Sequence, residues 1–413
     1  MKKITTAIIG GGAAGLVLAT ALKNTENVTI FERGERLGRK LSATGNGQGN
    51  VTNLGVLQTE YFSFSQNGNA RVNAILRAYD DKSFCDYLEK LGVLSLADER
   101  GRVYPASRQA SAITDALRFC VASRGVDVRQ NVTVTRLEKS AEGFILTAKT
   151  PEAEEKFLAE TVVLCAGGKA AKNFGTDGAA YALAQPFGHT LTALYPSLVQ
   201  LKTNVGSIKT LKGLRVNGGG LTAYIDGHEV CSLRGDIIFT DYGVSGDAVF
   251  RISAFVTDKI AERKVRLVID FLPEFSRQTV LDTLHKKRAA FPEQPIGELL
   301  CGVVNNQIGR AILKRAENDL EKAAALTKAF PLEVTGSLGF DYAQVTKGGL
   351  VLDEVDDELQ SKYATGLYFA GEILDVDGQC GGFNLQWVYS SARTVAAALD
   401  KKYAKIEKGG GQV

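Results

Sequence analysis

A glycine-rich turn near the N-terminus constrains this chain more than any other feature of its sequence. The turn separates an apolar strand from an apolar helix and places Gly10, Gly12 and Gly15 in a GxGxxG spacing. A second apolar strand is expected over residues 28–31, with Glu32 at its end. This order predicts a βαβ unit that binds an adenine dinucleotide: a strand, a glycine turn, a helix, a second strand and an acid.

Each of these residues has its own physical role in that prediction. Gly10 permits a tight turn, Gly12 lets the backbone approach a pyrophosphate, and Gly15 lets helix and strand pack closely. The helix N-terminus then faces the phosphates with free N–H groups and the positive end of its dipole. Glu32 is expected to accept hydrogen bonds from the adenosine ribose hydroxyls. The alternative interpretation is a chance glycine-rich turn.

Length, charge and cysteine content bound the class of protein. With 413 residues the chain exceeds what one hydrophobic core normally supports, so two or three domains are expected. Its 49 basic and 46 acidic residues give a net charge of +3, which neither requires nor excludes a nucleic-acid partner. The six cysteines form no CxxC pair, which favours reduced, buried thiols and argues against a metal site.

The start of the chain and its hydropathy indicate where the protein resides. Met1, Lys2 and Lys3 lead directly into the first strand, which leaves no room for a signal peptide. No apolar run reaches the length of a membrane span. We therefore expect a cytoplasmic protein with no membrane contact. The sequence gives no indication of an oligomeric state.

Hydrophobic periodicity outlines the first half of the chain. It predicts helices over residues 71–91 and 111–123 and β structure over 126–137 and 144–148. A further apolar strand over 161–165 runs into Ala166 and Gly167. This second strand-to-glycine turn would return the chain to the sheet beside the first phosphate loop, the alternative being an ordinary structural turn.

The middle of the chain has a different sequence pattern. Between residues 195 and 270, short β segments alternate with glycine and charge, which predicts a small antiparallel sheet or barrel, with a helix over 246–262. Residues 275–330 are expected to be largely helical. Only residues 408–413, rich in glycine, are expected to fray.

The last part of the chain points to the far half of a long cofactor. An apolar strand leads into Gly371 and Glu372, and residues 381–387 open a final helix that is expected to reach about Tyr403. The acid can bind a polyol chain, and the helix N-terminus can stabilise negative charge on a reduced flavin. NAD has no ribityl chain and no ring that becomes anionic on reduction, so this segment favours FAD.

Several motifs together resemble a known family. They are the segments 38–41, 44–53, 335–340, 346–349 and 371–378, and the Gly-Gly-Phe-Asn-Leu-Gln-Trp run at 381–387. Over essentially its whole length the chain resembles the bacterial HI-type flavoproteins, a family that holds aminoacetone oxidase, a bile-acid dienone reductase and a ribosomal-RNA dihydrouridine synthase. One departure is that residues 47–50 read Gly-Gln-Gly-Asn where many relatives carry Gly-Arg-Cys-Asn.

The resemblance implies an α/β fold with a Rossmann-like FAD domain of the glutathione-reductase type and inserted β-barrel-like and helical domains. The implied boundaries are 1–190 and 341–413 for the FAD domain, 191–272 and 331–340 for the β-rich domain, and 273–330 for the helical domain. The implied cofactor contacts are Gly10, Gly12, Ala14, Gly15, Glu32, Arg33, Arg39, Lys40 and Thr44, the backbone of Val134, Ala166 and Gly167, then Gly371, Glu372, Gly382, Phe383, Asn384, Leu385 and Gln386.

The remaining candidates have both a functional and a plain interpretation. Asn50, Cys380 and Asn384 are candidate catalytic residues, although a free cysteine more often packs than reacts. Arg39 and Lys40 are expected to contact phosphate, the alternative being a solvated charge pair. The histidines (His189, His228 and His285) are expected to be structural. Two acids (Asp375 and Asp377) could bind metal but are expected to cap local N–H groups of their tight turn.

These observations predict an FAD-dependent oxidoreductase that reduces an activated C=C bond in a nucleobase or an enone. With one dinucleotide fingerprint in the chain, NAD(P)H is expected to bind transiently over the flavin as electron donor. The alternatives are an oxidase of a small amine such as aminoacetone and a non-catalytic flavin-binding protein. Five basic residues of the middle segment could form a patch that faces RNA, and the alternative is ordinary solvated surface. They are Lys202, Lys209, Lys212, Arg215 and Arg234.

Overall fold

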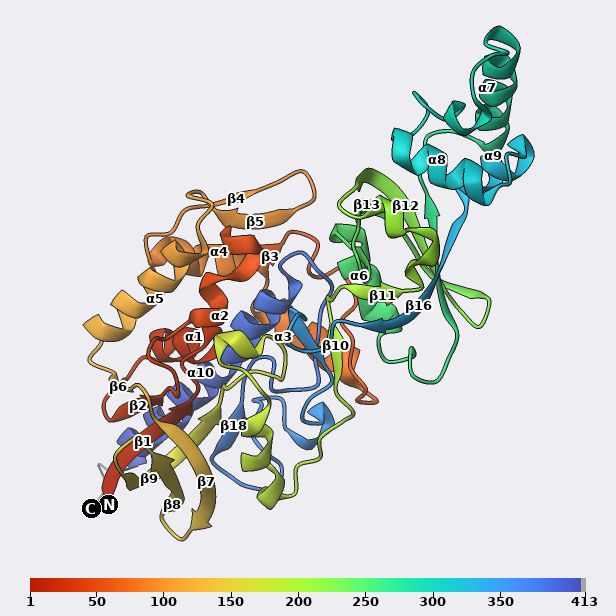
Figure 1. Ribbon diagram of the computed structural model, residues 1–413. Coiled ribbons are helices and arrows are strands. Elements are labelled where there is room, and N and C mark those ends of the chain that lie inside the picture. Colours follow the sequence, from red (N-terminus) through yellow and green to blue (C-terminus); the bar gives the residue numbers. More distant parts are fainter. Residues whose placement is uncertain (410–413) are drawn as a thin grey trace. The chain divides into compact units, whose positions relative to one another are not determined.

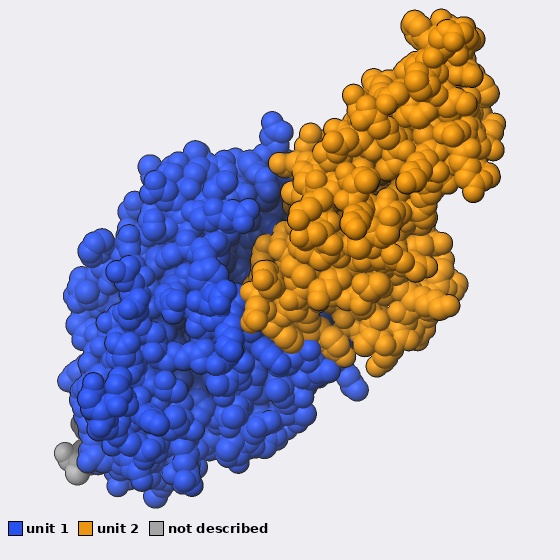
Figure 2. Space-filling model, viewed as in Figure 1, with its two compact units in different colours: residues 1–194, 345–413 blue, residues 195–344 orange. Residues whose placement is uncertain are grey.

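The computed structural model describes residues 1–409, which form two compact units (Figure 2). Unit 1 comprises residues 1–194 and 345 to the end of the described chain, and unit 2 comprises residues 195–344. The predicted fraying of residues 408–413 concerns mainly residues 410–413, which lie outside the described part. No helix in residues 1–409 combines the length and the apolarity that crossing a bilayer requires.

A seven-stranded sheet forms the centre of unit 1 (Figure 1). Its order is β6-β2-β1-β9-β8-β7, with β18 pairing to β9, and the run from β6 through β2, β1 and β9 to β18 is parallel. The bounds are β1 Lys2–Ile9, β2 Val28–Phe31, β6 Asp127–Arg129, β7 Thr133–Ser140, β8 Gly143–Lys149, β9 Glu154–Leu164 and β18 Leu367–Phe369. The Rossmann-type α/β fold predicted from the glycine turn is thus confirmed.

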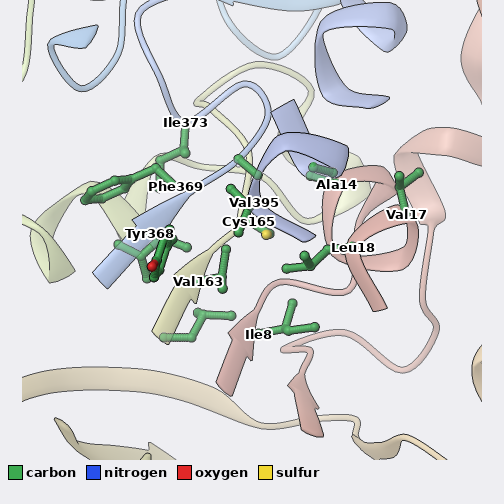
Figure 3. Close-up of a cluster of buried hydrophobic side chains, with 14 of the residues drawn as sticks. Ile8, Ala14, Val17, Leu18, Val163, Cys165, Tyr368, Phe369, Ile373 and Val395 are labelled. Carbon is green, nitrogen blue, oxygen red and sulfur yellow. The ribbon is translucent and has the colours of Figure 1, made fainter. Parts of the chain in front are cut away.

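Two helices from opposite ends of the chain pack on this sheet. They are α1 (Ala13–Ala21) and α10 (Phe383–Gly409). Helix α1 is buried at every position from 14 to 20, because it lies between the sheet and its neighbouring helices. Figure 3 shows Leu18 of α1 and Val395 of α10 close to Ile8 and Val163 of the central strands.

Three more helices of unit 1 are α3 (Gly68–Ala78), α4 (Asp81–Lys90) and α5 (Ala110–Ser123). The single helix predicted over 71–91 is wrong, because the chain leaves helical geometry at Tyr79 and restarts after Asp80. The Asp80 carboxylate accepts the Ser83 N–H (2.9 Å) and caps the second helix. The remaining short elements of unit 1 are α2 Arg39–Ser42 and β17 Val345–Lys347.

A small sheet, β3-β5-β4, was not foreseen from the sequence (Figure 1). Its strands are β3 Thr52–Asn53, β4 Ser95–Ala97 and β5 Arg102–Pro105. All pairs are antiparallel, and β4 forms one edge. The strands are too short for their periodicity to be read from sequence.

Unit 2 is built on a closed antiparallel barrel with the order β11-β14-β13-β12-β15-β16, as predicted. Its strands are β11 Leu201–Thr203, β12 Arg215–Ile225, β13 His228–Phe239, β14 Gly243–Ser245, β15 Val265–Asp270 and β16 Phe330–Ser337, and β10 Tyr195–Ser197 precedes them. The hairpin β12–β13 turns at Asp226 and Gly227, both with positive φ, as a two-residue hairpin turn requires.

The helices of unit 2 share one core with its barrel. They are α6 Asp247–Val256, α7 Arg277–Ala290, α8 Asn306–Arg315 and α9 Leu320–Lys328. Helix α6 ends before the predicted residue 262, and 275–330 is helical as predicted but in separate pieces. Leu284 of α7 and Ile312 of α8 belong to the same cluster as Ile269 of β15. The division into three domains stays a prediction.

The cysteines are all unpaired in residues 1–409, which agrees with the prediction of reduced thiols. Burial was predicted less well. Cys165, at the end of β9, is buried, and the other five are partly exposed. No group of acids, histidines and cysteines in the described residues has the arrangement of a metal site.

Candidate functional site

The carboxyl ends of the central parallel strands lie level with one another. Ile9 pairs with Phe31 and Leu164, and Leu164 also pairs with Phe369. Three backbone bonds tie the segments that follow: Gly10 N–H to Phe31 (2.8 Å), Cys165 N–H to Ile9 (2.8 Å) and Ala370 N–H to Leu164 (3.1 Å). This edge is where α/β sheets bind ligands.

The glycines of the fingerprint differ in what surrounds them. A Cβ atom on Gly10, where φ is +107°, would lie 2.7 Å from the Ala166 Cα, so this turn packs against the end of β9. A Cβ on Gly15 would lie 2.1 Å from the Gly10 carbonyl oxygen. A Cβ on Gly12 would meet no atom within 4 Å. Gly10 and Gly15 are therefore packing positions, and Gly12 faces open space.

The N-terminus of α1 offers backbone donors to that open space. Leu16 donates the first intrahelical bond, to the Gly12 carbonyl (3.0 Å), so the N–H groups of residues 13–15 precede the helical pattern. Gly12 occupies the N-cap position and has no side chain to satisfy them. Donors at the positive end of a helix dipole, beside an open position, fit a pyrophosphate.

Glu32 stands at the end of β2, as predicted. Its Oε2 accepts the Gly11 N–H (2.8 Å) and its Oε1 accepts the Gly34 N–H (2.7 Å), so the carboxylate fixes both turns that frame it. A carboxylate has about four acceptor positions, and two backbone donors leave others for ribose hydroxyls.

The arginines near this edge bind the segment that follows β9. Arg33 pairs with Asp177 (2.9 Å) and also donates to the Gly175 carbonyl, and Arg39 donates to the Asn173 carbonyl (2.9 Å). This segment continues from Ala166 and Gly167, which lie next to the first glycine turn. The two guanidinium groups therefore hold a neighbouring loop in place.

Lys40 and Glu372, predicted as separate cofactor contacts, form an ion pair of 2.7 Å. The other oxygen of Glu372 accepts the Thr346 N–H (2.8 Å), and the Thr346 hydroxyl accepts N–H groups of Lys169 and Ala170. The pair thus links α2, the end of β9, β17 and the end of β18. Thr346 lies in the motif 346–349, but its part in this network was not predicted, because its partners are distant along the chain.

The loop 44–50 lies after α2 and contains two consecutive left-handed residues, Gly45 and Asn46. Thr44 donates its hydroxyl to the Leu41 carbonyl (2.7 Å). The Asn50 amide donates to carbonyls of Thr52 (3.2 Å) and Val103 (3.0 Å). The side-chain amide of Asn50 therefore supports the small sheet. A catalytic role would need the same amide group.

The start of α10 is docked on β3. A Cβ on Gly382 would lie 2.2 Å from the Thr52 carbonyl oxygen, so only glycine allows this approach. The Thr52 hydroxyl donates to the buried Gln386 amide, whose nitrogen donates to the Tyr79 carbonyl (2.7 Å). The Tyr61 hydroxyl donates to the Phe383 carbonyl (2.9 Å). Sequence reasoning missed Thr52 and Tyr61.

The turn before α10 is held by Asn384. Its Oδ1 accepts the Gly378 N–H (2.9 Å), and its Nδ2 donates to the carbonyls of Gly378 (2.8 Å) and Gln379 (3.2 Å). Cys380 lies in the same turn and is half-buried. Asn384 thus shapes this turn with every polar atom of its side chain.

The other predicted contacts have ordinary structural surroundings. Val134 is buried on β7, next to a register shift, and Leu385 is partly buried against the core. Gly371 donates its N–H to Ser391 (2.9 Å), and its carbonyl accepts from the Trp387 indole (3.1 Å). The site prediction as a whole stays a prediction.

Comparison with known proteins shows the family of this chain. The sequence model of the family described as HI0933-like protein Rossmann domain matches residues 4–398. The chain belongs to the HI0933-like family. This family membership confirms the resemblance found in the sequence motifs.

The chain is 33% identical to a 3-dehydro-bile acid delta(4,6)-reductase of Clostridium scindens, over 96% of this chain and 98% of that protein. It is 27% identical to a ribosomal RNA dihydrouridine synthase of Haemophilus influenzae, over 96% and 98% of the two chains. A solved 3-ketosteroid-delta4-(5alpha)-dehydrogenase of Rhodococcus jostii has the same fold, with a TM-score of 0.52, 17% identity and coverage of 96% and 97%. The protein is an FAD-dependent oxidoreductase.

Asp375 is a buried residue whose partners the sequence could not reveal. Its Oδ2 accepts the N–H groups of Phe64 (2.8 Å) and Ser65 (3.1 Å) and the Ser63 hydroxyl (3.1 Å). Its Oδ1 is buried with no partner in the described residues. Burial, partly offset by these hydrogen bonds, raises the pKa of Asp375 to about 6. Asp375 does cap N–H groups, but they belong to residues 64 and 65, which are distant in sequence, and not to its own turn as predicted.

Titration of Asp375 should make the fold less stable as the pH rises. A carboxyl whose pKa is higher in the folded state than in the unfolded chain stabilises the fold below the unfolded value and loses that effect through the folded value. Raising the pKa from 3.8 to about 6 corresponds to roughly 3 kcal/mol. The difference in unfolding free energy between wild type and Asp375→Asn should fall by this amount from about pH 3 to pH 7, in urea titrations.

Asp127→Asn is the matched control. Although burial opposes it, hydrogen bonds from Lys2 and Arg129 lower the pKa of Asp127, so its contribution should rise with pH. A wild-type advantage over Asp375→Asn that stays constant or grows with pH would contradict the assignment.

His189 and the basic residues of unit 2 have the following surroundings. His189 is buried, its Nε2 hydrogen-bonds with the Ser361 hydroxyl (2.7 Å), and its Nδ1 lies 3.4 Å from a carboxylate oxygen of Glu354. Burial lowers the pKa of His189 against the opposing effect of Glu354. Of the five basic residues considered for RNA, three form ion pairs with acids: Lys212 with Asp241, Arg215 with Asp236 and Arg234 with Glu274.

Proposed function

We propose that FAD lies along the carboxyl edge of the unit 1 sheet, with its pyrophosphate at the N-terminus of α1 and its ribose at Glu32. The open position at Gly12 and the donors of residues 13–15 support the first placement. We place the flavin at the start of α10, where Gly382 leaves helix N–H groups without a capping side chain. When bound, FAD supplies hydride transfer to and from carbon.

The reaction we infer is reduction of a carbon–carbon double bond conjugated to a ketone in an apolar substrate. The observation that carries this proposal is the identity of 33%, over nearly the whole of both chains, to a protein named 3-dehydro-bile acid delta(4,6)-reductase. The electrons come from NADH or NADPH, which binds transiently, since the chain carries one dinucleotide fingerprint.

The protein's own residues act by positioning. Thr52 and Gln386 fix the first turn of α10 relative to β3, and Asn384 fixes the turn that precedes it. Backbone donors in these fixed turns can hold a flavin ring and stabilise negative charge that develops on it. A preorganised site of this kind requires no rearrangement during the reaction.

Anaerobic mixing experiments test the reaction. We expect NADH or NADPH to bleach the visible absorbance of the oxidised flavin and a 3-keto-4,6-diene steroid to restore it, with one double bond lost per flavin reoxidised. Reoxidation by oxygen with formation of hydrogen peroxide, in the presence of an amine and without a nicotinamide, would identify an amine oxidase instead. Failure of every donor and acceptor would favour the non-catalytic alternative.

A second candidate is reduction of uracil in ribosomal RNA. The identity of 27% to a ribosomal RNA dihydrouridine synthase, with similar coverage, favours it. The C5=C6 bond of uracil is also conjugated to a carbonyl, so the chemistry is of the same type. Replacing the steroid by unmodified ribosomal RNA in the same experiment, with dihydrouridine as the measured product, separates the two substrates.

A further inference from the structure

The small sheet β3-β5-β4 presents a face that continues into the turn before α10. Residues opposite one another in antiparallel strands point to the same face. The pairs Asn53 with Arg102 and Leu96 with Tyr104 therefore lie on one face. The Asn53 amide donates to the Gly381 carbonyl (3.1 Å), and a Cβ on Gly381 would lie 3.8 Å from the Arg102 Cγ.

Two arginines on this face differ in their charge balance. Arg102 is neutralised by Asp98, at 2.7 and 2.8 Å. Arg108 is exposed, and its guanidinium carbon lies 4.2 Å from the centre of the buried Tyr104 ring. In the described residues, no carboxylate lies within ion-pair distance of Arg108. A guanidinium stacked on a ring keeps its edge free to bind an anion through two parallel bonds.

The backbone holds Arg108 in position. Its φ is +53°, an uncommon conformation for a residue other than glycine, and its N–H donates to the Pro105 carbonyl (2.8 Å). Pro105 and the start of α5 also contact the loop 44–50, because a Cβ on Gly49 would lie 2.9 Å from the Ala110 Cα. Arg108 thus lies between the end of β5 and the start of α5, and both of these segments contact the loop 44–50.

Apolar surface lies beside this cation. Leu96 is 56% exposed and Leu94 is 66% exposed, both on the edge strand β4 or directly before it. These two side chains offer exposed apolar surface that an apolar group can cover. A polyanion such as RNA would gain nothing from them, whereas an apolar molecule with one anionic end would use both the leucines and the arginine.

We propose that Arg108 binds the carboxylate of the substrate while Leu94 and Leu96 contact its apolar body. The inference rests on the proposed function and narrows its substrate class to apolar enones that carry a carboxylate. Arg108 lies outside the turns that we assign to FAD. It therefore determines which substrate binds and does not hold the cofactor.

The test compares one steroid enone as a free carboxylate and as its methyl ester. In the wild-type holoenzyme, KM for the acid should be lower than for the ester. Arg108→Gln should raise KM for the acid by about tenfold, the effect of losing one charge-assisted contact of moderate strength, and leave the ester unchanged. Arg108→Lys should recover part of the loss, since it keeps the charge without the two parallel donors.

Two further variants complete the design. Arg136→Gln removes an exposed arginine of unit 1 that is paired with Glu138, and it should change neither KM. Leu96→Ser should raise KM for acid and ester alike, because it removes apolar contact only. FAD content and Tm of each variant are measured alongside, and both should match the wild type.

The outcomes separate this inference from the proposed function. Equal KM values for acid and ester in wild type, or equal effects of Arg108→Gln on both, would overturn the role of Arg108 while leaving the enone reductase intact. If wild type reduces neither compound, the proposed function fails. Equilibrium binding of the two compounds to the oxidised holoenzyme then still tests Arg108, since loss of acid binding alone in Arg108→Gln supports it and equal binding overturns it.

Discussion

Gly12→Val is expected to give a folded protein that no longer retains FAD. The Gly12 backbone has φ −76° and ψ −167°, an extended conformation that valine adopts readily, and a Cβ there meets no protein atom within 4 Å. The fold should therefore tolerate the change. The new methyl groups would occupy the space that we assign to the pyrophosphate, so FAD affinity should fall by more than about a hundredfold, or roughly 2.7 kcal/mol.

The measurement is the FAD released per chain on denaturation, together with the melting temperature of the FAD-free protein. Gly297→Val in unit 2 is the matched control, because a Cβ there also meets no atom within 4 Å and its φ is not positive. The control should retain FAD as the wild type does. Stoichiometric FAD in Gly12→Val would show that the pyrophosphate lies elsewhere.

Asn384→Asp is expected to lower the free energy of unfolding by about 3 kcal/mol. The Asn384 amide nitrogen donates to two carbonyl oxygens, and a carboxylate would replace both bonds by repulsion from the same oxygens. An acid in the first turn of a helix normally gains about 0.5 kcal/mol from the dipole, which is too little to compensate. In the FAD-loaded variant, the added negative charge should also lower the midpoint potential, since α10 begins at the proposed flavin site.

Asn305→Asp provides the contrast. Asn305 caps α8 by accepting the Gln307 N–H (3.0 Å), a role that aspartate fills equally well. Urea unfolding of both variants should show destabilisation for Asn384→Asp alone. Two equal, small effects would mean that the hydrogen bonds of Asn384 contribute little, and an unchanged midpoint potential would move the flavin away from α10.

The βαβ unit could be predicted from the glycine fingerprint because the residues that determine it are close together in sequence. Gly10, Gly12 and Gly15 lie within one turn, and their conformational demands follow from the absence of a side chain. The barrel of unit 2 was predictable for a similar reason, since alternating β segments without βαβ spacing favour antiparallel pairing. Helices α3 and α4 were merged in the prediction because hydrophobic periodicity does not register a break of two residues, Tyr79 and Asp80, between two helices.

The polar contacts that shape the site were not predictable in the same way. Thr52 bonds to Gln386 across 334 residues of sequence, and Asp375 binds Ser63 across 312. Neither partner is distinguished by its neighbours along the chain. Asn50 and Asn384 were considered for catalysis because of their residue type, and the structure shows their amides bonded to backbone carbonyls.

The sequence by itself determined the βαβ unit, the family and hence the FAD-dependent class of chemistry, because glycine spacing and motif identity are properties of short segments. Only the tertiary structure decided that Lys40 pairs with Glu372, that Asp375 is buried with a raised pKa, and that Arg108 stacks on Tyr104. Distance, burial and charge balance depend on which distant segments the fold brings together, and a linear pattern carries no direct record of them.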